Sequence, residues 1–146
     1  MSTIRDILET KGSRVYATAP EATVHQAVDE MCRHRVGALL VLDEQTPVGI
    51  VSERDVMTRV VLRRLDPAVV RVAAVMTGRV VCIELDRSIG EAMAVMTERR
   101  CRHLPVVVDQ KVVGVVSIGD LVRWASRDQD YEIRLLHEYL EGRYPG

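Results

Sequence analysis

A seven-residue phrase occurs twice in this chain, and the repetition limits the possible folds more than any other feature. The first copy, residues 49–55, reads GIVSERD, and the second, residues 114–120, reads GVVSIGD. The shift of 65 residues extends without a gap from Arg14/Arg79 onward, with identities that include Val15/Val80, Ala27/Ala92, Met31/Met96, Leu39/Leu104 and Val41/Val106. A constant shift over so long a stretch predicts two copies of one supersecondary unit, since one such unit cannot bury its apolar face alone.

The apolar periodicity predicts the order β-α-β-β-α within each copy. In the first copy the expected elements are a strand over 15–18, a helix over 24–34 capped by Thr23, strands over 36–42 and 48–51, and a helix that starts at Ser52 and stops before Pro67. A short helix over 3–9, with Thr3 as its N-cap, precedes the first copy. Val72, Val75 and Met76 repeat its apolar pattern before the second copy.

We therefore expect an α+β (α/β-like) fold in which two repeats pack with approximate two-fold symmetry around a shared cleft. The expected division is 1–70 for the first repeat with its N-terminal helix and linker, 71–125 for the second repeat, and 126–146 for a C-terminal helical extension. Helical spacing after Asp120 predicts one long C-terminal helix, with an apolar stripe of Trp124, Ile133, Leu136, Tyr139 and Leu140. The stripe packs either on its own domain or on a partner subunit, and we favour the partner.

Charge and cysteine usage exclude several classes of function. The net charge is −1 with acidic and basic residues interspersed, which argues against a nucleic-acid or acidic-membrane surface. No apolar run approaches the roughly 20 residues of a membrane helix, and the first residues do not resemble a signal peptide, so we expect a cytoplasmic protein. Cys32 and Cys101 both begin Cys-Arg-His triplets, but these lie 69 residues apart and are not equivalent, so we expect no metal site.

The Ser-x-x-Asp at the end of each phrase has two possible roles. As a capping box, Ser52 with Asp55, and Ser117 with Asp120, would only close the start of a helix. As a binding site, the same helix N-terminus would attract an anionic phosphate, and the aspartate could accept hydrogen bonds from vicinal ribose hydroxyls. A flat base could then lie against apolar strand edges. Neither phrase is a Walker loop or a dinucleotide fingerprint.

The doubled unit, with Gly-φ-φ-Ser-x-x-Asp at its last strand–helix junction, resembles a tandem pair of cystathionine-β-synthase-type (CBS) domains, also called a Bateman module. The resemblance runs from about Ile4 to Trp124 and includes Val75-Met76-Thr77 and the stretch 103–107, HLPVV. The extended C-terminus resembles that of small stand-alone bacterial members. The resemblance implies a non-catalytic regulatory module that binds an adenosine-containing ligand, such as AMP, ADP, ATP, S-adenosylmethionine or NAD. The partners that it implies are a second copy of the chain, as a homodimer, and an unidentified regulated protein.

The resemblance also implies roles for individual residues. Asp55 and Asp120 would bind ribose, with Ser52 and Ser117 beside ribose or phosphate. Arg102 and His103 would reach phosphate, helped by Arg54, whereas the equivalent Gly37 and Ala38 carry no charge, so the two sites should differ. The base would lie near Thr18, Ile83, Val51 and Val116. Arg102 and Arg54 could instead be surface charges, and His103 a half-buried, hydrogen-bonded histidine.

Two other classes of function compete with the ligand sensor. An enzyme would need a nucleophile with a base, and neither Ser52 nor Ser117 has a histidine at a convincing spacing. A ligand-independent dimerisation or interaction scaffold would use both motifs as helix caps only. The sequence favours the sensor.

Overall fold

The structure, a computed structural model, describes residues 2–127, 134 and 136–143, and it forms two compact units. One unit comprises residues 15–80 and carries the sheet of the first repeat, so we call it the first-repeat unit. The other comprises residues 1–14 together with residues 81–146, and we call it the second-repeat unit. Each is described by itself.

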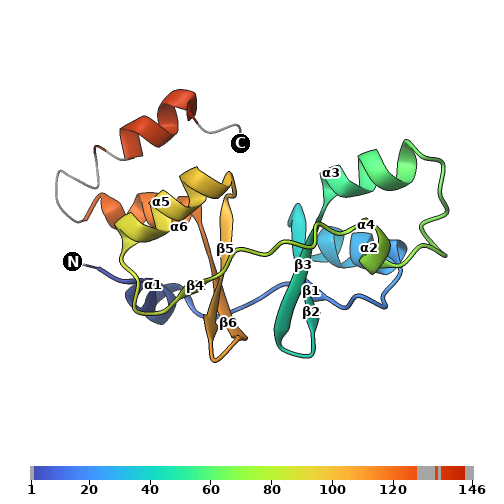
Figure 1. Ribbon diagram of the computed structural model, residues 1–146, viewed down its shortest axis with the longest axis horizontal. Helices are drawn as coiled ribbons and strands as arrows, with labels where there is room; N and C mark the ends of the chain where they lie inside the picture. Colours follow the sequence, from blue (N-terminus) through green and yellow to red (C-terminus); the bar gives the residue numbers. More distant parts are fainter. Residues whose placement is uncertain (1, 128–133, 135, 144–146) are drawn as a thin grey trace. The chain divides into compact units, whose positions relative to one another are not determined.

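The first-repeat unit is a three-stranded sheet with helices packed beside it (Figure 1). Its elements are β1 (Ala17–Thr18), α2 (Val24–His34), β2 (Ala38–Asp43), β3 (Thr46–Ser52), α3 (Glu53–Val56), the π-helical turn η1 (Met57–Val61) and α4 (Val72–Val75). Strand β1 runs parallel to β2, and β2 pairs antiparallel with β3. This register places Ala38, at the start of β2, opposite Ser52, at the end of β3.

The second-repeat unit has the same sheet and the same order of strands (Figure 1). Its elements are α1 (Ile4–Lys11), β4 (Ile83–Glu84), α5 (Ile89–Arg99), β5 (His103–Val108), β6 (Lys111–Ser117), α6 (Ile118–Ala125) and the π-helical turn η2 (Tyr139–Arg143). The irregularity in strand register falls at Val41/Leu42 in one sheet and at Val106/Val107 in the other, which are 65 residues apart. The predicted repeat and its β-α-β-β-α order are confirmed.

The helices begin and end where local chemistry dictates. The Thr23 hydroxyl accepts a hydrogen bond from the Gln26 amide at the start of α2, and Ser88 does the same for Glu91 at the start of α5. Both helices end on an arginine in the left-handed conformation, Arg35 at φ 55° and Arg100 at φ 53°. The predicted bounds of α2, residues 24–34, agree with the structure.

Each unit has its own apolar core. In the first-repeat unit the core consists of Val24, Ala27, Met31, Leu39, Val41, Val51, Val60, Val72 and Val75. In the second-repeat unit it includes Ile4, Ile7, Leu8, Ile89, Met96, Leu104, Val106, Val116 and Leu121. Each core contains strand residues with both neighbouring helices, as expected for strands that are covered by helices.

The short helices that precede the repeats are exchanged between the units. Helix α1 joins the second-repeat unit, where the Ile4 amide donates to the Arg87 carbonyl at 3.0 Å. Helix α4 joins the first-repeat unit, where the Val72 amide donates to the Ala22 carbonyl at 2.8 Å. The compact units of the structure therefore differ from the expected division, which assigned residues 1–70 to the first repeat. Ile4, Ile7 and Leu8 bury their apolar face in the core of the second repeat instead.

The expected long C-terminal helix is not supported by the described residues. Helix α6 ends at Ala125 and residues 126–127 form a turn, while Ile133 lies outside the described residues. Leu136 and Tyr139 are buried in the core of the second-repeat unit, so this part of the stripe packs on its own unit rather than on a partner. Leu140 is exposed, and the backbone of Gly142, the expected stop, lies inside η2. Among the described residues, no helix is long and apolar enough to cross a membrane.

Candidate functional site

The first Ser-x-x-Asp lies at the junction of β3 and α3 and forms a complete capping box. The Ser52 amide donates to Oδ2 of Asp55 at 2.9 Å, and the Asp55 amide donates to the Ser52 hydroxyl at 3.2 Å. The Arg59 guanidinium lies 4.0 Å from Oδ1 of Asp55, beyond hydrogen-bond distance, and donates instead to the carbonyls of Val75 and Met76. Asp55 Oδ1 is therefore available to a further donor.

The second Ser-x-x-Asp lies at the junction of β6 and α6, and two cations occupy its carboxylate. The Ser117 amide donates to Oδ2 of Asp120 at 2.8 Å, as in the first repeat. Lys11 Nζ lies 2.7 Å from the same Oδ2, and Arg123 Nη2 lies 2.6 Å from Oδ1. Each oxygen of the carboxylate is therefore engaged by a charged donor, and the Asp120 side chain is only 5% exposed.

Lys11 is held at this site by the docking of α1. It is the last residue of α1, and the chain turns away at Gly12, whose φ of 92° favours glycine. Lys11 Nζ also donates to the Val115 carbonyl at 2.9 Å. Leu8, one turn earlier, packs directly on Gly114, where an added Cβ would lie 2.8 Å from Leu8 Cδ1. The glycine of the repeated phrase thus makes room for the helix that delivers Lys11.

The charges around Asp120 shift two ionisable groups. Burial alone would raise the pKa of Asp120, but hydrogen bonds from Lys11 and Ser117 outweigh it, and the pKa is lowered. The pKa of His103 is lowered chiefly because the ring is partly desolvated. The Asp120 charge opposes this shift, while the charges of Lys11 and Arg102 add to it. His103 is exposed at the surface, and its lowered pKa favours the neutral imidazole at pH 7.

The start of the middle strand differs in charge between the repeats, as the sequence predicts. In both units the residue just before this strand accepts a hydrogen bond from the first amide of the following helix. The Glu53 amide donates to the Gly37 carbonyl, and the Ile118 amide donates to the Arg102 carbonyl, each at 2.9 Å. The first repeat places uncharged Gly37 there, beside the Glu53 carboxylate. The second repeat places the exposed side chain of Arg102 and then His103, which lies opposite Ser117 in the sheet.

The residues predicted to surround the base are mostly core residues. Val51, Val116 and Ile83 are 5% exposed or less, and their side chains belong to the two cores. Contact with a ligand would thus have to come from their backbone. Thr18, at the end of β1, is partly exposed, and Arg54 is an exposed residue in the first turn of α3. These five assignments stay predictions.

Three cationic residues at the two motifs were not predicted. Arg59 follows Asp55 by four residues and Arg123 follows Asp120 by three, so both lie on the same helix face as the aspartate and could have been found from that spacing. Lys11 lies 109 residues from Asp120 in the sequence. No local pattern links these two residues, because their contact depends on the exchanged helix.

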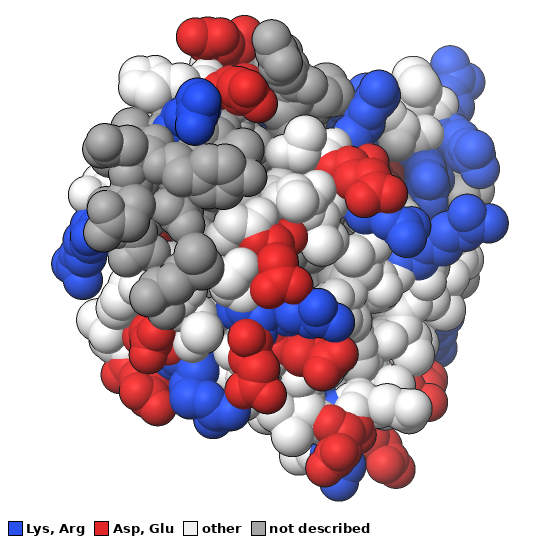
Figure 2. All heavy atoms as spheres, turned by 60° about the vertical axis from the view of Figure 1, so that its left-hand side comes forward, with Lys and Arg blue, Asp and Glu red and all other residues white. Residues whose placement is uncertain are grey.

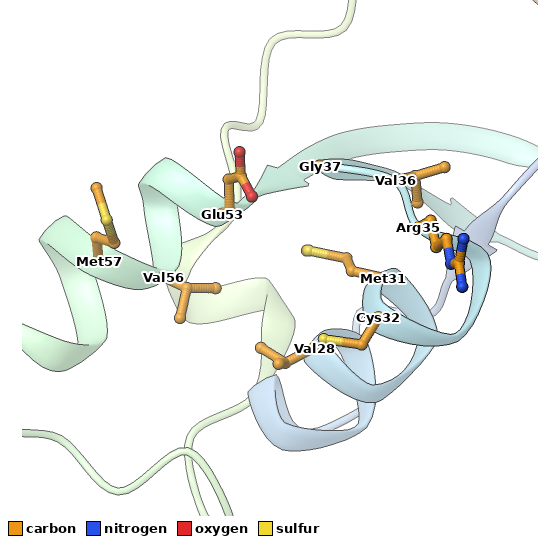
Figure 3. Close-up of a pocket in the computed structure, with 9 residues that line it drawn as sticks. All are labelled: Val28, Met31, Cys32, Arg35, Val36, Gly37, Glu53, Val56 and Met57. Carbon is orange, nitrogen blue, oxygen red and sulfur yellow. The ribbon is translucent and has the colours of Figure 1, made fainter.

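A pocket of about 500 Å³ lies between α2 and α3 in the first-repeat unit (Figure 3). Met31 and Val56 point into this space from opposite helices, whereas Arg35 points away from it. Its other lining residues are Val28, Cys32, Val36, Gly37, Glu53 and Met57. None of the predicted ligand residues lines this pocket, although Glu53 lies within the first motif and its amide donates to the Gly37 carbonyl.

The described surface and cysteines give no sign of a metal or of one dominant charge. Acidic and basic side chains are mixed over much of the face in Figure 2. Within the described part of the chain, no group of three His, Cys, Asp or Glu residues could hold a metal ion. Burial raises the pKa of the Cys82 and Cys101 thiols, which makes them weaker metal ligands and nucleophiles.

Comparison with known proteins agrees with this architecture. The family model of the CBS domain matches the chain twice, over residues 4–62 and 72–127. The mitochondrial CBS domain-containing protein CBSX3 of Arabidopsis thaliana is 33% identical over 98% of this chain and 74% of its own length. A solved CBS-domain protein from Burkholderia ambifaria is 40% identical, with a TM-score of 0.78 over 88% of this chain and 97% of its own. The solved CBS domain NE2398 is 38% identical, with a TM-score of 0.77 over 86% of this chain and 98% of its own.

Proteins built from such pairs are typically regulatory and bind ligands. The family model matches the chain twice, and the repeated sheets and Ser-x-x-Asp junctions agree with two such domains. The chain belongs to the CBS-domain family and carries a tandem pair of these domains.

Proposed function

We propose that this protein is a non-catalytic regulatory module that binds an adenosine-containing ligand, AMP, ADP, ATP or NAD, through its two Ser-x-x-Asp junctions. Asp55 and Asp120 would accept the ribose hydroxyls, and Ser52 and Ser117 would lie beside ribose or phosphate. Arg102 and His103, with Arg54, would contact phosphate. The protein would act by changing the activity of a partner that is not yet identified.

One observation carries the proposal, namely that a carboxylate lies in the first turn of a helix, directly after a strand, at the same place in both units. The partial positive charge of the helix N-terminus favours an anion, and the carboxylate accepts hydroxyl donors. Asp55 is 13% exposed, and its Oδ1 has no hydrogen bond among the described residues. A cap alone needs only one carboxylate oxygen, so the second oxygen is free for a ligand.

One solved relative offers a chemical precedent. The CBS domain pair of protein MJ0100 was solved in complex with 5′-methylthioadenosine and S-adenosyl-L-methionine. At 24% identity and a TM-score of 0.70, its likeness to this chain is one of fold, so its ligands are properties of that protein. They make adenosine derivatives the first compounds to test here.

We also propose that the protein is a homodimer. Seven large apolar side chains are exposed among the described residues, and five of these lie in residues 57–69 of the first-repeat unit: Met57, Val61, Leu62, Leu65 and Val69. So many exposed apolar side chains in one short stretch of the chain support an interaction surface there. A second copy is the simplest occupant, because a two-fold interface places the same apolar patch on both sides.

The competing function is a scaffold that dimerises without a ligand. In that case both Ser-x-x-Asp units would serve as caps only, and the apolar stretch at residues 57–69 would carry the whole function. The geometry of the capping boxes is compatible with this alternative, whereas the free Oδ1 of Asp55 favours a ligand.

Thermal unfolding with and without nucleotide distinguishes the two functions. A compound that binds only the folded protein raises the free energy of unfolding by mass action, by about 2.7 kcal/mol at one hundred times its Kd. The midpoint of thermal unfolding rises as a result. We expect AMP, ATP or NAD at millimolar concentration to raise the midpoint of the wild type and not that of the Asp55→Ala, Asp120→Ala double variant. Equal midpoints for the wild type with every nucleotide would favour the scaffold.

A further inference from the structure

The two motif aspartates differ in how many cations they hold. Asp120 accepts hydrogen bonds from Lys11 and Arg123, in addition to the capping amide of Ser117. Asp55 has its capping bonds and one guanidinium at 4.0 Å, which belongs to Arg59 and donates to two backbone carbonyls instead. The same sequence motif thus carries a free acceptor in one unit and a neutralised carboxylate in the other.

A ribose that approaches Asp120 must displace or share Lys11 at Oδ2 or Arg123 at Oδ1. Lys11 Nζ lies 2.7 Å from Oδ2, which is the oxygen that also takes the capping bond, and the Asp120 side chain is almost wholly buried. A displaced ammonium would keep its bond to the Val115 carbonyl but would lose its only carboxylate among the described residues. An uncharged nucleoside offers nothing to replace that partner, whereas a phosphate does.

We infer that Lys11 makes the second-repeat site selective for phosphorylated adenosine ligands over uncharged nucleosides, by exchanging the Asp120 carboxylate for the ligand's phosphate. The inference rests on the proposed function and adds a binding residue to it. Lys11 is 36% exposed, so its flexible side chain can reach a ligand without moving α1.

The surroundings of Lys11 supply further positive charge in the same place. Lys11 lies within hydrogen-bond distance of Asp120, and the charges of Lys11 and Arg102 both act to lower the pKa of His103. Two cations, Lys11 and Arg102, beside the one carboxylate of Asp120 give this group a net positive charge, and bound ribose hydroxyls do not change that charge. The first repeat has Gly37 and Ala38 at the corresponding strand start, so we expect this selectivity in the second repeat alone.

The chain contains two lysines, Lys11 and Lys111, which provides a matched control. Lys111 is exposed at the first position of β6, whereas the motif lies at the last position of that strand. Lys11→Met and Lys111→Met remove the same charge and keep similar side-chain length. An Asp55→Ala background restricts the measurement to the second-repeat site.

Isothermal titration with AMP and with adenosine tests the selectivity. We expect Lys11→Met to weaken AMP binding by about tenfold or more, since it removes a charge-assisted hydrogen bond, and to leave adenosine binding equal or tighter. Lys111→Met should match its parent for both compounds. Equal AMP-to-adenosine affinity ratios in the Lys11→Met variant and its parent would overturn the inference while the proposed function stands. Failure of wild-type protein to bind either compound would overturn the proposed function itself.

A measurement without a Lys11 substitution covers the case in which Lys11→Met does not fold. Reductive methylation with carbon-13 gives one side-chain NMR signal for each lysine of the wild-type chain. AMP should shift the Lys11 signal and leave the Lys111 signal in place, and adenosine should produce the smaller Lys11 shift of the two. A Lys11 signal that does not respond to saturating AMP would contradict the proposed exchange.

Discussion

Leu8 of α1 packs so closely on Gly114 of β6 that no side chain fits between them. A Cβ at position 114 would lie 2.8 and 2.9 Å from the two terminal carbons of Leu8, which is itself 8% exposed and surrounded by core residues. The glycine of the repeated phrase is therefore explained by packing, since the α1 helix that carries Lys11 could not otherwise approach the strand.

Gly114→Ala should destabilise the protein. The new methyl group would push Leu8 and α1 outward, at a cost of about 1–3 kcal/mol in the free energy of unfolding. Urea denaturation measures the change. Gly78→Ala is the control, because an added Cβ there meets no atom within 4 Å. Partial rescue by Leu8→Ala in the double variant would confirm that the clash is with this residue, and an unaltered stability of Gly114→Ala would contradict the packing described.

Ser117→Ala separates the capping role of the motif from its binding role. The Ser117 hydroxyl accepts a hydrogen bond from the Asp120 amide, and its loss should lower the free energy of unfolding by about 1 kcal/mol. Thr23→Ala removes an equivalent cap from α2, far from any motif aspartate in the sequence, and should cost a similar amount. Only Ser117→Ala should also weaken nucleotide binding. Equal nucleotide affinity in both variants would leave Ser117 with a structural role alone.

Asp120→Asn should be more destabilising than Asp55→Asn at pH 7. The first variant leaves Lys11 and Arg123 close together without their carboxylate, which costs on the order of 1–3 kcal/mol, whereas Asp55 has no charged hydrogen-bond donor. Chemical denaturation of both variants and the wild type makes the comparison. A smaller loss for Asp120→Asn than for Asp55→Asn would contradict the ion pairs.

The difference between wild type and Asp120→Asn should depend on pH. Because the pKa of Asp120 is lowered from 3.8 in the folded protein, its charged form stabilises the fold above about pH 4. That contribution is lost as the pH falls through the lower, folded-state pKa. The two proteins should therefore differ at pH 7 and converge in strong acid. A difference that grows on acidification would mean that the pKa is raised instead.

His103 should make the stability of the ligand-free protein depend on pH in a higher range. Its pKa is lowered from 6.5, so the unfolded chain takes up a proton before the folded one, and the wild type loses stability as the pH falls below 6.5. Glutamine takes up no proton in this range, so His103→Gln should lose less stability than the wild type between pH 7.5 and pH 5.5. Thermal melts at these two values test the difference. Identical pH profiles for the two proteins would show that the imidazole is not desolvated.

The proposed dimer predicts a single-site variant that is monomeric. Leu62 is 77% exposed in the apolar stretch 57–69, and a glutamate there would place like charges on both sides of a two-fold interface. Light scattering after size exclusion should give half the wild-type mass for Leu62→Glu. Val108→Glu, at an exposed apolar residue of the other unit, should keep the wild-type mass. Dissociation of Val108→Glu but not Leu62→Glu would place the interface elsewhere.

Local patterns in the sequence predicted most of the elements and the positions of both motifs. The bounds of α2 follow from Thr23 and from the apolar spacing of Val24, Ala27 and Met31, which are local signals. The sequence could not assign α1 to the second repeat, because its apolar face fits either core and only packing decides. The contact of Lys11 with Asp120 could not be predicted for the same reason, since it forms only when α1 packs on the second repeat.

The C-terminus illustrates a second limit. The spacing of Leu136, Tyr139 and Leu140 is helical, but periodicity does not say whether the helix continues from α6 or what covers the stripe. The chain turns after Ala125, and the core of the second-repeat unit buries Leu136 and Tyr139. The side chains of Ile83, Val51 and Val116 were similarly placed on the correct strands but are buried in the cores.

The most direct test of the central claim is titration of the wild-type protein with AMP by isothermal calorimetry, repeated with the Asp55→Ala, Asp120→Ala double variant. The account predicts saturable binding to the wild type and loss of that binding in the double variant, whose circular dichroism should still match the wild type. Absence of heat with AMP, ATP and NAD at millimolar concentration, or undiminished binding by a folded double variant, would contradict it.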